Sequence, residues 1–182
     1  MEYRYRYKTP EGFSDLWLSG DGDCLTGLWF EGSRDSGKHP ANGKQEMLPV
    51  FEDTLRWLDV YFSGRQPDFT PKWKIDEATP FRREVVSLML EIPFGQTVTY
   101  GELAKKLAAG HGVSRMSAQA VGGAVGWNPI CLIIPCHRVL GAGGALTGYG
   151  GGIGNKLALL RLEGSCPAAA SGDFRPASCN RR

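Results

Sequence analysis

The sequence predicts a mixed α/β (α+β) protein, in which an N-terminal α+β domain with an antiparallel sheet precedes a mostly helical C-terminal domain. Three observations support this prediction. The first thirty residues combine an alternating segment with two apolar runs and indicate strands, apolar residues of the second half recur at helical spacing, and prolines punctuate residues 65–80 between them. We therefore expect a first domain with its linker at 1–78, a second domain at 79–164 and a disordered tail at 165–182.

The N-terminal domain begins with predicted strands. Tyr3, Tyr5 and Tyr7 alternate with basic residues, which indicates a half-buried strand. Two apolar runs, 16–18 and 25–30, flank a Ser-Gly-Asp-Gly-Asp stretch and predict a hairpin. The Asp-Gly-Asp stretch lacks the later ligands of a calcium-binding loop, so we interpret it as a turn.

A loop and a helix complete this domain. Residues 31–44 are polar and rich in glycine, which is typical of a loop. Apolar residues then recur at helical spacing, with Gly64 as a stop signal, at Phe51, Leu55, Leu58 and Phe62.

The C-terminal domain is predicted to open with a helix that Thr79-Pro80 starts, since a capping residue followed by proline favours a first turn. Its expected buried stripe consists of Phe81, Val85, Leu88 and Met89. The next helix begins at Thr99, where Glu102 completes a capping box, and ends at Gly110.

A third helix of this domain is predicted at 115–125, with Ser114 as its cap and Gly126 as its stop. Two short helices joined by a tight glycine-containing turn have the spacing of a helix-turn-helix. The second of them is made largely of small residues, which leaves two interpretations open. Either it packs closely against a neighbouring element, or it approaches DNA closely, in the minor groove, without reading sequence.

The end of the C-terminal domain is predicted to hold a strand and a helix. Ile130–Ile134 is an apolar, β-branched run, which indicates a short buried strand. Asn155 is the expected cap of the last helix, and Gly164 follows that helix. The leucines expected inside are Leu157, Leu160 and Leu162.

The charge is unevenly distributed, although the whole chain carries only +2. Residues 1–80 hold ten basic and fourteen acidic side chains, whereas residues 81–182 hold eleven basic and five acidic ones. A basic half suggests a polyanion such as nucleic acid as partner, and the alternative is chance combined with a basic tail.

The sequence favours an intracellular, cytoplasmic protein. It has no signal-peptide pattern and no apolar stretch long enough to cross a membrane. Its five cysteines are odd in number and scattered, which excludes a simple disulfide framework and offers no zinc site. We therefore expect no metal.

Cys136 is the candidate nucleophile, because Pro135 ends the predicted strand before it and His137 follows it. An unperturbed thiol is only slightly ionised at neutral pH, so a nucleophilic cysteine needs a nearby base or positive charge. His137 is a candidate base, directly or through a water, and Arg138 adds positive potential or anchors the turn. The alternative is a buried cysteine acting as a small hydrophobe, which is how we interpret Cys131.

Residues 135–139 (Pro-Cys-His-Arg-Val), preceded by Asn128-Pro129, resemble the active-site signature of the methylated-DNA–protein-cysteine methyltransferases, or 6-O-alkylguanine-DNA alkyltransferases. The resemblance covers 79–164 in order and at compatible spacing, and residues 1–78 match only loosely. Its other matching segments are 92–95, 100–104, 120–124, 147–152 and 159–164.

The resemblance implies a ribonuclease H-like N-terminal domain and a winged helix-turn-helix-like C-terminal domain. It implies DNA repair by irreversible transfer of an alkyl group from 6-O-alkylguanine to Cys136, once per molecule, after the nucleotide is flipped out. It also implies no cofactor, a monomer, and duplex DNA carrying alkylated guanine as the partner, bound through the minor groove regardless of sequence.

The resemblance also implies catalytic roles for several residues of this chain. The resemblance implies that His137 acts through a water as base and that Glu163 orients it. Tyr100 would donate a hydrogen bond to the purine, and Asn128 would brace the turn before the active-site segment. Without the resemblance, Glu163 is an ordinary residue at a helix end and Tyr100 a core tyrosine.

Substrate binding is implied for Arg138, Val139, Tyr149 and Gly150. The carbonyls of Cys136 and Val139 are expected to hold the guanine amino group. The Tyr149-Gly150 loop would cover the base, because glycines allow the backbone to approach a planar ligand closely.

The implied DNA-binding residues are Arg115, Ala118, Gln119, Ala120, Gly122 and Gly123. The sequence departs from the family pattern at Gln119, where the family has an arginine that fills the vacated base stack. We therefore expect an active protein with less efficient base flipping and either weaker DNA binding or an altered substrate preference, unless Arg115 or Met116 compensates.

Three other functions are alternatives for this sequence. A lesion-binding relative that transfers nothing has tryptophan at the position of Cys136, so the thiol argues against it. A helix-turn-helix regulator needs sequence-specific contacts that a helix rich in alanine and glycine offers poorly. A cysteine hydrolase would turn over and ignore DNA.

Overall fold

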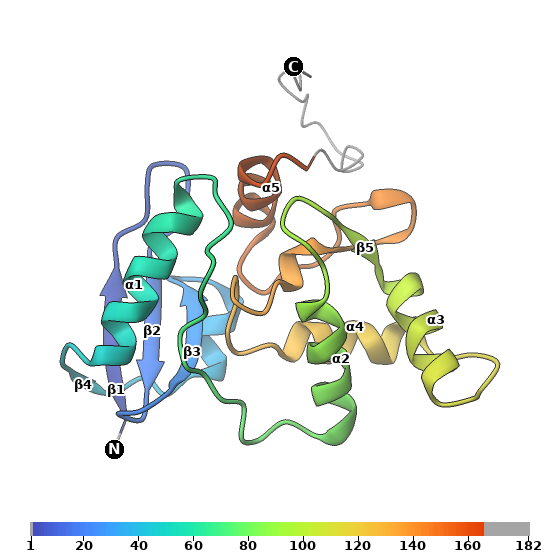
Figure 1. Cartoon of the computed structure of the whole chain (residues 1–182), viewed down its shortest axis with the longest axis horizontal. Helices are drawn as coiled ribbons and strands as arrows, with labels where there is room; N and C mark the ends of the chain where they lie inside the picture. Colours follow the sequence, from blue (N-terminus) through green and yellow to red (C-terminus); the bar gives the residue numbers. More distant parts are fainter. Residues whose placement is uncertain (1, 166–182) are drawn as a thin grey trace.

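The computed structural model describes residues 2–165, which form a four-stranded sheet, a two-stranded sheet and five α-helices. The four-stranded sheet has the order β3-β2-β1-β4, with antiparallel pairs except for the parallel β1–β4 pair. In Figure 1 the sheet and α1 lie on one side, α2, α3 and α4 on the other, and α5 between them. The strands of the four-stranded sheet are β1 (Tyr3–Tyr7), β2 (Leu16–Gly20), β3 (Leu25–Phe30) and β4 (Lys44–Gln45), and the two-stranded sheet pairs β5 (Val98–Thr99) in parallel with β6 (Val139–Leu140). Within residues 2–165, none of the helices combines the length and the apolar composition that a membrane-spanning helix needs.

The predicted N-terminal strand and hairpin are confirmed. β1 occupies the alternating tyrosine segment, and β2 and β3 pair antiparallel with Leu18 opposite Leu28. The predicted turn between them is closed by Asp21, whose carboxylate accepts hydrogen bonds from the backbone N–H groups of Asp23 and Cys24.

The prediction of a plain loop at 31–44 is wrong in part. Arg34–Lys38 forms a 3₁₀ turn, η1, and Lys44 begins β4. The turn is held in place by tertiary contacts: the Asp35 N–H donates to the Gly150 carbonyl and the side chain of Asp35 is buried. Local composition does not report such long-range contacts.

The predicted helix at Phe51–Phe62 is confirmed as α1 (Pro49–Phe62), which begins two residues earlier because Pro49 occupies its first turn. The buried side chains of Phe51, Leu58 and Tyr61 pack into the main core. Gly64 follows with φ of 79°, a conformation that glycine adopts without strain.

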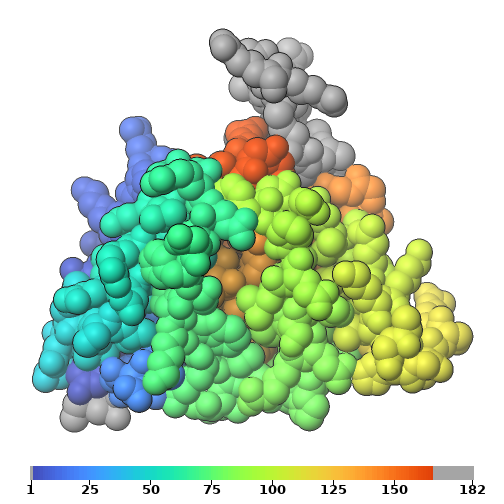
Figure 2. Space-filling view, viewed as in Figure 1, coloured from blue at the N-terminus to red at the C-terminus, as the bar shows by residue number. Residues whose placement is uncertain are grey.

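Residues 65–80 join the two halves closely. The backbone of Trp73 bridges to Leu25 at the edge of β3, and Ile75 and Ala78 are buried. Ile130 bridges to Leu28 on the same strand, so this edge carries segments from both halves. Figure 2 shows 65–80 crossing one face of the molecule. One hydrophobic core therefore spans both halves, and the boundary between 1–78 and 79–164 stays a prediction.

The first two C-terminal helices have the predicted caps. α2 (Pro80–Leu90) begins where the Thr79 hydroxyl accepts a bond from the Arg82 N–H, and α3 (Tyr100–Gly110) begins with the Thr99–Glu102 capping box. In α2, Val86 is buried together with Val85 and Met89, whereas the predicted stripe members Phe81 and Leu88 are only partly buried.

The prediction of the third helix named the wrong serine as its N-cap. Ser117, not Ser114, caps α4 (Ala118–Trp127), because its hydroxyl accepts the bond from the Ala120 N–H. Gly126 lies inside the helix rather than ending it, and Arg115 lies in the segment before it. α3 and α4 pack against each other as a helical pair.

The predicted strand at Ile130–Ile134 is wrong, although its burial is correct. Apart from the Ile130 bridge, the segment is a tight turn in which Leu132 takes a φ of 67°. The Ile134 N–H donates to the Ile130 carbonyl, so the backbone folds back instead of pairing. The β-branched residues of this segment are therefore explained by their burial in the core and not by the pairing of a β-strand.

The last helix, α5 (Ile153–Leu162), is capped by Gly152 rather than by Asn155. Asn155 instead binds Ser14 and the Gly151 carbonyl through its side chain. Leu157 and Leu162 are partly exposed, and the buried face consists of Lys156, Leu159 and Leu160. Ser165, predicted to be in the disordered tail, is buried and donates a hydrogen bond to the Gly95 carbonyl, while 166–182 lies outside the described residues.

Candidate active site

Cys136 begins η2 (Cys136–Arg138), a 3₁₀ turn directly after the folded-back segment. Asn128 holds that segment through three bonds: its Nδ2 donates to the Ile134 carbonyl at 2.8 Å and to Cys136 Sγ at 3.0 Å, and its Oδ1 accepts from the Ile130 N–H. Asn128 therefore closes the turn and also contacts the sulfur.

Burial raises the pKa of the Cys136 thiol, and the hydrogen bond from Asn128 and the charge of Lys156 oppose this rise only in part. The resting thiol is therefore protonated at neutral pH. A reaction at this sulfur needs a group that removes its proton, because the thiolate is the nucleophile.

His137, Arg138 and Glu163 form a buried network next to Cys136. His137 Nε2 lies 2.8 Å from Glu163 Oε1, and Arg138 holds both carboxylate oxygens through Nε at 2.9 Å and Nη2 at 3.0 Å. The Gly95 N–H also donates to Glu163 Oε2. Burial favours the neutral carboxyl, but the bonds from His137 and Arg138 outweigh it and hold the pKa of Glu163 well below its usual range.

These contacts decide which nitrogen of His137 carries the proton. Burial lowers the pKa of His137, while the bond from Glu163 opposes this, so the ring is mostly neutral at pH 7. Nε2 faces an ionised carboxylate and must hold the proton as donor. Nδ1 is buried without a partner, which leaves its lone pair free to accept a proton.

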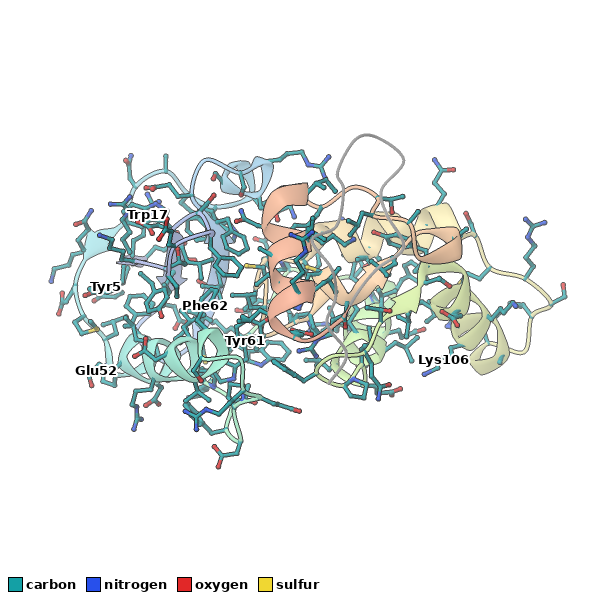
Figure 3. All side chains as sticks on the ribbon, turned by 90° about the horizontal axis from the view of Figure 1, so that it is seen from above. Tyr5, Trp17, Glu52, Tyr61, Phe62 and Lys106 are labelled. Carbon is teal, nitrogen blue, oxygen red and sulfur yellow. The ribbon has the colours of Figure 1, made fainter. Side chains whose placement is uncertain are left out.

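Tyr61 enters this network from α1, and sequence reasoning missed it. Its hydroxyl lies 2.6 Å from Glu163 Oε1 and 3.3 Å from His137 Nε2. Figure 3 shows the side chain projecting from α1 toward the C-terminal half. A tyrosine on an amphipathic helix has the same pattern as an ordinary core residue, so no sequence signal marks it.

Lys156 was also missed. Its side chain is fully buried, and its Nζ donates to the carbonyls of Val139 at 2.7 Å and Thr147 at 3.2 Å. Burial lowers the pKa of Lys156 to about 8, and the nearby Cys136 opposes this. Lys156 shares a helix face with Leu159 and Leu160, and a charged residue on an apolar face was the available signal.

A cavity of about 80 Å³ opens onto the cysteine. Most of the residues predicted for catalysis and base binding meet there. The cavity is lined by Tyr100, Gly122, Asn128, Cys136, Tyr149 and Gly150. The Tyr149 hydroxyl is buried without a hydrogen-bond partner. A Cβ atom added to Gly122 would lie 3.9 Å from the Tyr100 ring.

The N-terminal half forms one wall of the same cavity through η1. The Asp35 carboxylate pairs with Lys38 at 2.5 Å, and Lys38 Nζ donates to the carbonyls of Gly126 at 2.5 Å and Asn128 at 3.4 Å. A Cβ on Gly150 would lie 1.9 Å from Asp35 Oδ1, so only glycine fits there. This wall was not predicted from sequence.

Other predicted site residues lie elsewhere. Arg138 was predicted to bind substrate, but it lies outside the cavity lining. Its guanidinium instead donates hydrogen bonds to Glu163 and, at 2.7 Å, to the Ile92 carbonyl. The Val139 carbonyl already accepts from Lys156, which leaves it one free lone pair. The predicted DNA-binding residues Arg115, Ala118, Gln119, Ala120 and Gly123 are exposed on or before α4.

Comparisons with known proteins agree on one group. Residues 80–165 match the family model described as "6-O-methylguanine DNA methyltransferase, DNA binding domain". A methylated-DNA–protein-cysteine methyltransferase of Methanosarcina acetivorans is 45% identical over 160 residues, which are 88% of this chain and 97% of the relative. One from Haemophilus influenzae is 40% identical over 90% of this chain and 86% of its own length. The crystal structure of Mycobacterium tuberculosis OGT in complex with DNA is similar with a TM-score of 0.75 and 36% identity, covering 88% of this chain and 92% of that one.

Proposed function

Because the chain belongs to the family of methylated-DNA–protein-cysteine methyltransferases, we propose that Cys136 is the residue that accepts the alkyl group. The protein repairs DNA by transferring an alkyl group from 6-O-alkylguanine to a cysteine of its own. One observation carries the assignment: Cys136 lines the cavity, and the next residue, His137, has a free Nδ1 and is paired with a buried carboxylate.

The chemistry follows from these positions. The thiol proton passes through a water to His137 Nδ1, and the sulfur attacks the alkyl carbon. An S–C bond forms while the C–O bond to guanine breaks, and the purine leaves as an anion. Tyr100, which lines the cavity, donates a hydrogen bond to the purine as its charge develops. The thioether is stable, so each molecule reacts once.

The guanine reaches this cavity after the nucleotide leaves the duplex. The cavity is far smaller than the roughly 300 Å³ at the lower end of ordinary ligand pockets. Entry of the base therefore requires the loop at 148–150 to move outward. Tyr149 and Gly150 then cover the base, and the backbone carbonyls of Cys136 and Val139 accept from its amino group.

DNA is bound through the exposed face of α4, in the minor groove and independently of sequence. The α3–α4 pair serves as a winged helix-turn-helix-like unit, and the N-terminal half as a ribonuclease H-like domain. The protein works as a monomer in the cytoplasm, where Cys136 stays reduced; the cysteines among the described residues are free thiols.

The assignment is tested by intact-protein mass after mixing with duplex DNA that contains 6-O-methylguanine. We expect one added methylene, mapped to Cys136, and consumption of one equivalent of lesion. An unchanged mass with tight binding would select a lesion-binding protein, and repeated turnover would select a hydrolase.

Gln119→Arg is expected to tighten duplex binding or to speed transfer, because arginine adds a charge and a planar group that fills the vacated stack. Gln119 is exposed on α4, so the change costs little stability. Binding to duplex DNA and the single-turnover rate report the result. Gln96→Arg, at an exposed position outside α4, is the matched control. Equal values for Gln119→Arg and the parent protein would refute a deficit at this position.

A further inference from the structure

Tyr61 is held rigidly beside the histidine–carboxylate pair. It is fully buried, stacks on Trp57 at 5.3 Å between ring centroids, and contacts Phe94 edge-on at 5.8 Å. Its hydroxyl reaches Glu163 Oε1, the same oxygen that accepts from His137 Nε2. A residue of the N-terminal half therefore contacts the group that orients the base of the C-terminal half.

The phenol of Tyr61 donates a hydrogen bond here and keeps its proton. Burial raises the pKa of Tyr61 far above its usual value, and the negative charge of Glu163 raises it further, so the hydroxyl keeps its proton. The carboxylate can only accept, because its own pKa is held low. The 2.6 Å contact is thus a short bond from Tyr61 to an ionised oxygen.

We propose that Tyr61 is a positioning residue that lowers the basicity of His137 through Glu163 and so keeps the imidazole able to accept a proton at neutral pH. This inference rests on the proposed role of His137 as base. The bond from Tyr61 withdraws negative charge from the oxygen that would otherwise stabilise a protonated His137. A base is most effective when its pKa lies near the working pH, because a higher pKa leaves less of the neutral form and a much lower pKa weakens the base.

Other charged and titratable groups around His137 set the background. Arg138 and Lys156 disfavour its protonation, Glu163 favours it, and Cys136 precedes it in the chain. The weak 3.3 Å contact between Tyr61 and Nε2 acts in the opposite sense to the proposed effect. We expect it to be outweighed, because the bond to the charged oxygen is shorter by 0.7 Å.

The test is the pH profile of the single-turnover transfer rate for Tyr61→Phe, with a duplex carrying 6-O-methylguanine. We expect the acid limb to move to higher pH, with a rate roughly threefold lower at its acid end, which corresponds to about half a pH unit, and a parent-like rate at high pH. A ¹⁵N-histidine NMR titration of His137 should show the same upward shift.

Tyr7→Phe is the matched control. Tyr7 is also a buried tyrosine, and its hydroxyl donates to the carboxylate of Asp59 on α1 at 2.8 Å, away from His137. This variant should lose a part-buried bond from a tyrosine to a carboxylate without moving the acid limb. A uniform loss of rate at all pH values in Tyr61→Phe, a superimposable profile, or a shift to lower pH would overturn the proposal.

A second variant keeps the test open if Tyr61→Phe does not fold. A single 3-fluorotyrosine at position 61 makes the phenol a stronger hydrogen-bond donor, so the acid limb should move to lower pH.

The His137→Asn variant distinguishes a failure of the role of Tyr61 from a failure of the role of His137 as base. If it loses transfer while the Tyr61 variants leave the acid limb in place, only the role of Tyr61 fails. If it transfers at the parent rate, the base role of His137 fails and this proposal with it.

Discussion

Replacing Cys136 with serine is expected to reduce methyl transfer by roughly a thousandfold or more, the scale seen when an enzyme loses its nucleophile. A serine hydroxyl ionises far less readily than a thiol, so His137 removes its proton much less efficiently. The buried site remains filled, because oxygen and sulfur differ little in size. The measurement is the rate of lesion loss from duplex DNA together with the mass of the protein.

Cys24→Ser provides the control for this variant. Cys24 is a free, half-buried thiol that follows the β2–β3 turn, far in sequence from the site. It should react at the parent rate and gain the same methylene. Lesion removal by Cys136→Ser at the parent rate would show that another residue accepts the alkyl group.

Replacing Glu163 with glutamine is expected to lower the free energy of unfolding by roughly 3–5 kcal/mol, the usual cost of removing one partner from a buried ion pair. The Glu163 side chain is fully buried and Arg138 nearly so. The new amide would also place donors against the donors of Tyr61, His137 and Arg138. Transfer should fall as well, because His137 loses the group that fixes its tautomer.

The contribution of Glu163 to the free energy of unfolding depends on pH. The pKa of Glu163 is lowered in the folded protein, so its contribution is present above the unfolded value near 4.5 and is lost as pH falls toward the folded value. The difference between parent and Glu163→Gln should therefore be largest at pH 6–7 and shrink below about pH 4. Denaturant unfolding of both proteins at neutral pH and at acid pH measures this difference.

Glu84→Gln is the matched control. Glu84 pairs with His111 at 2.6 Å, but both side chains are more than 40% exposed. An exposed pair contributes roughly 1 kcal/mol or less. If Glu163→Gln cost no more than Glu84→Gln, the buried network would not stabilise the fold.

Local signals were sufficient where a few neighbouring residues decide the structure. The Thr99–Glu102 capping box depends on bonds within four residues, and α3 begins there as predicted. The choice between Ser114 and Ser117 as the next cap could not be made in this way, because either serine offers the same hydroxyl. The packing of α4 against α2 and α3 decided it.

The sequence by itself determined the nucleophile candidate, its histidine neighbour and the order of segments from 79 to 164, because these lie within short motifs whose spacing is visible in the chain. Only the tertiary structure decided which distant side chains complete the site: Tyr61, Asp35 and Lys38 from the N-terminal half, and Lys156 from α5. A bond such as Tyr61–Glu163 joins residues 102 positions apart. Its formation depends on how the two halves pack, and no periodicity or local propensity records that packing.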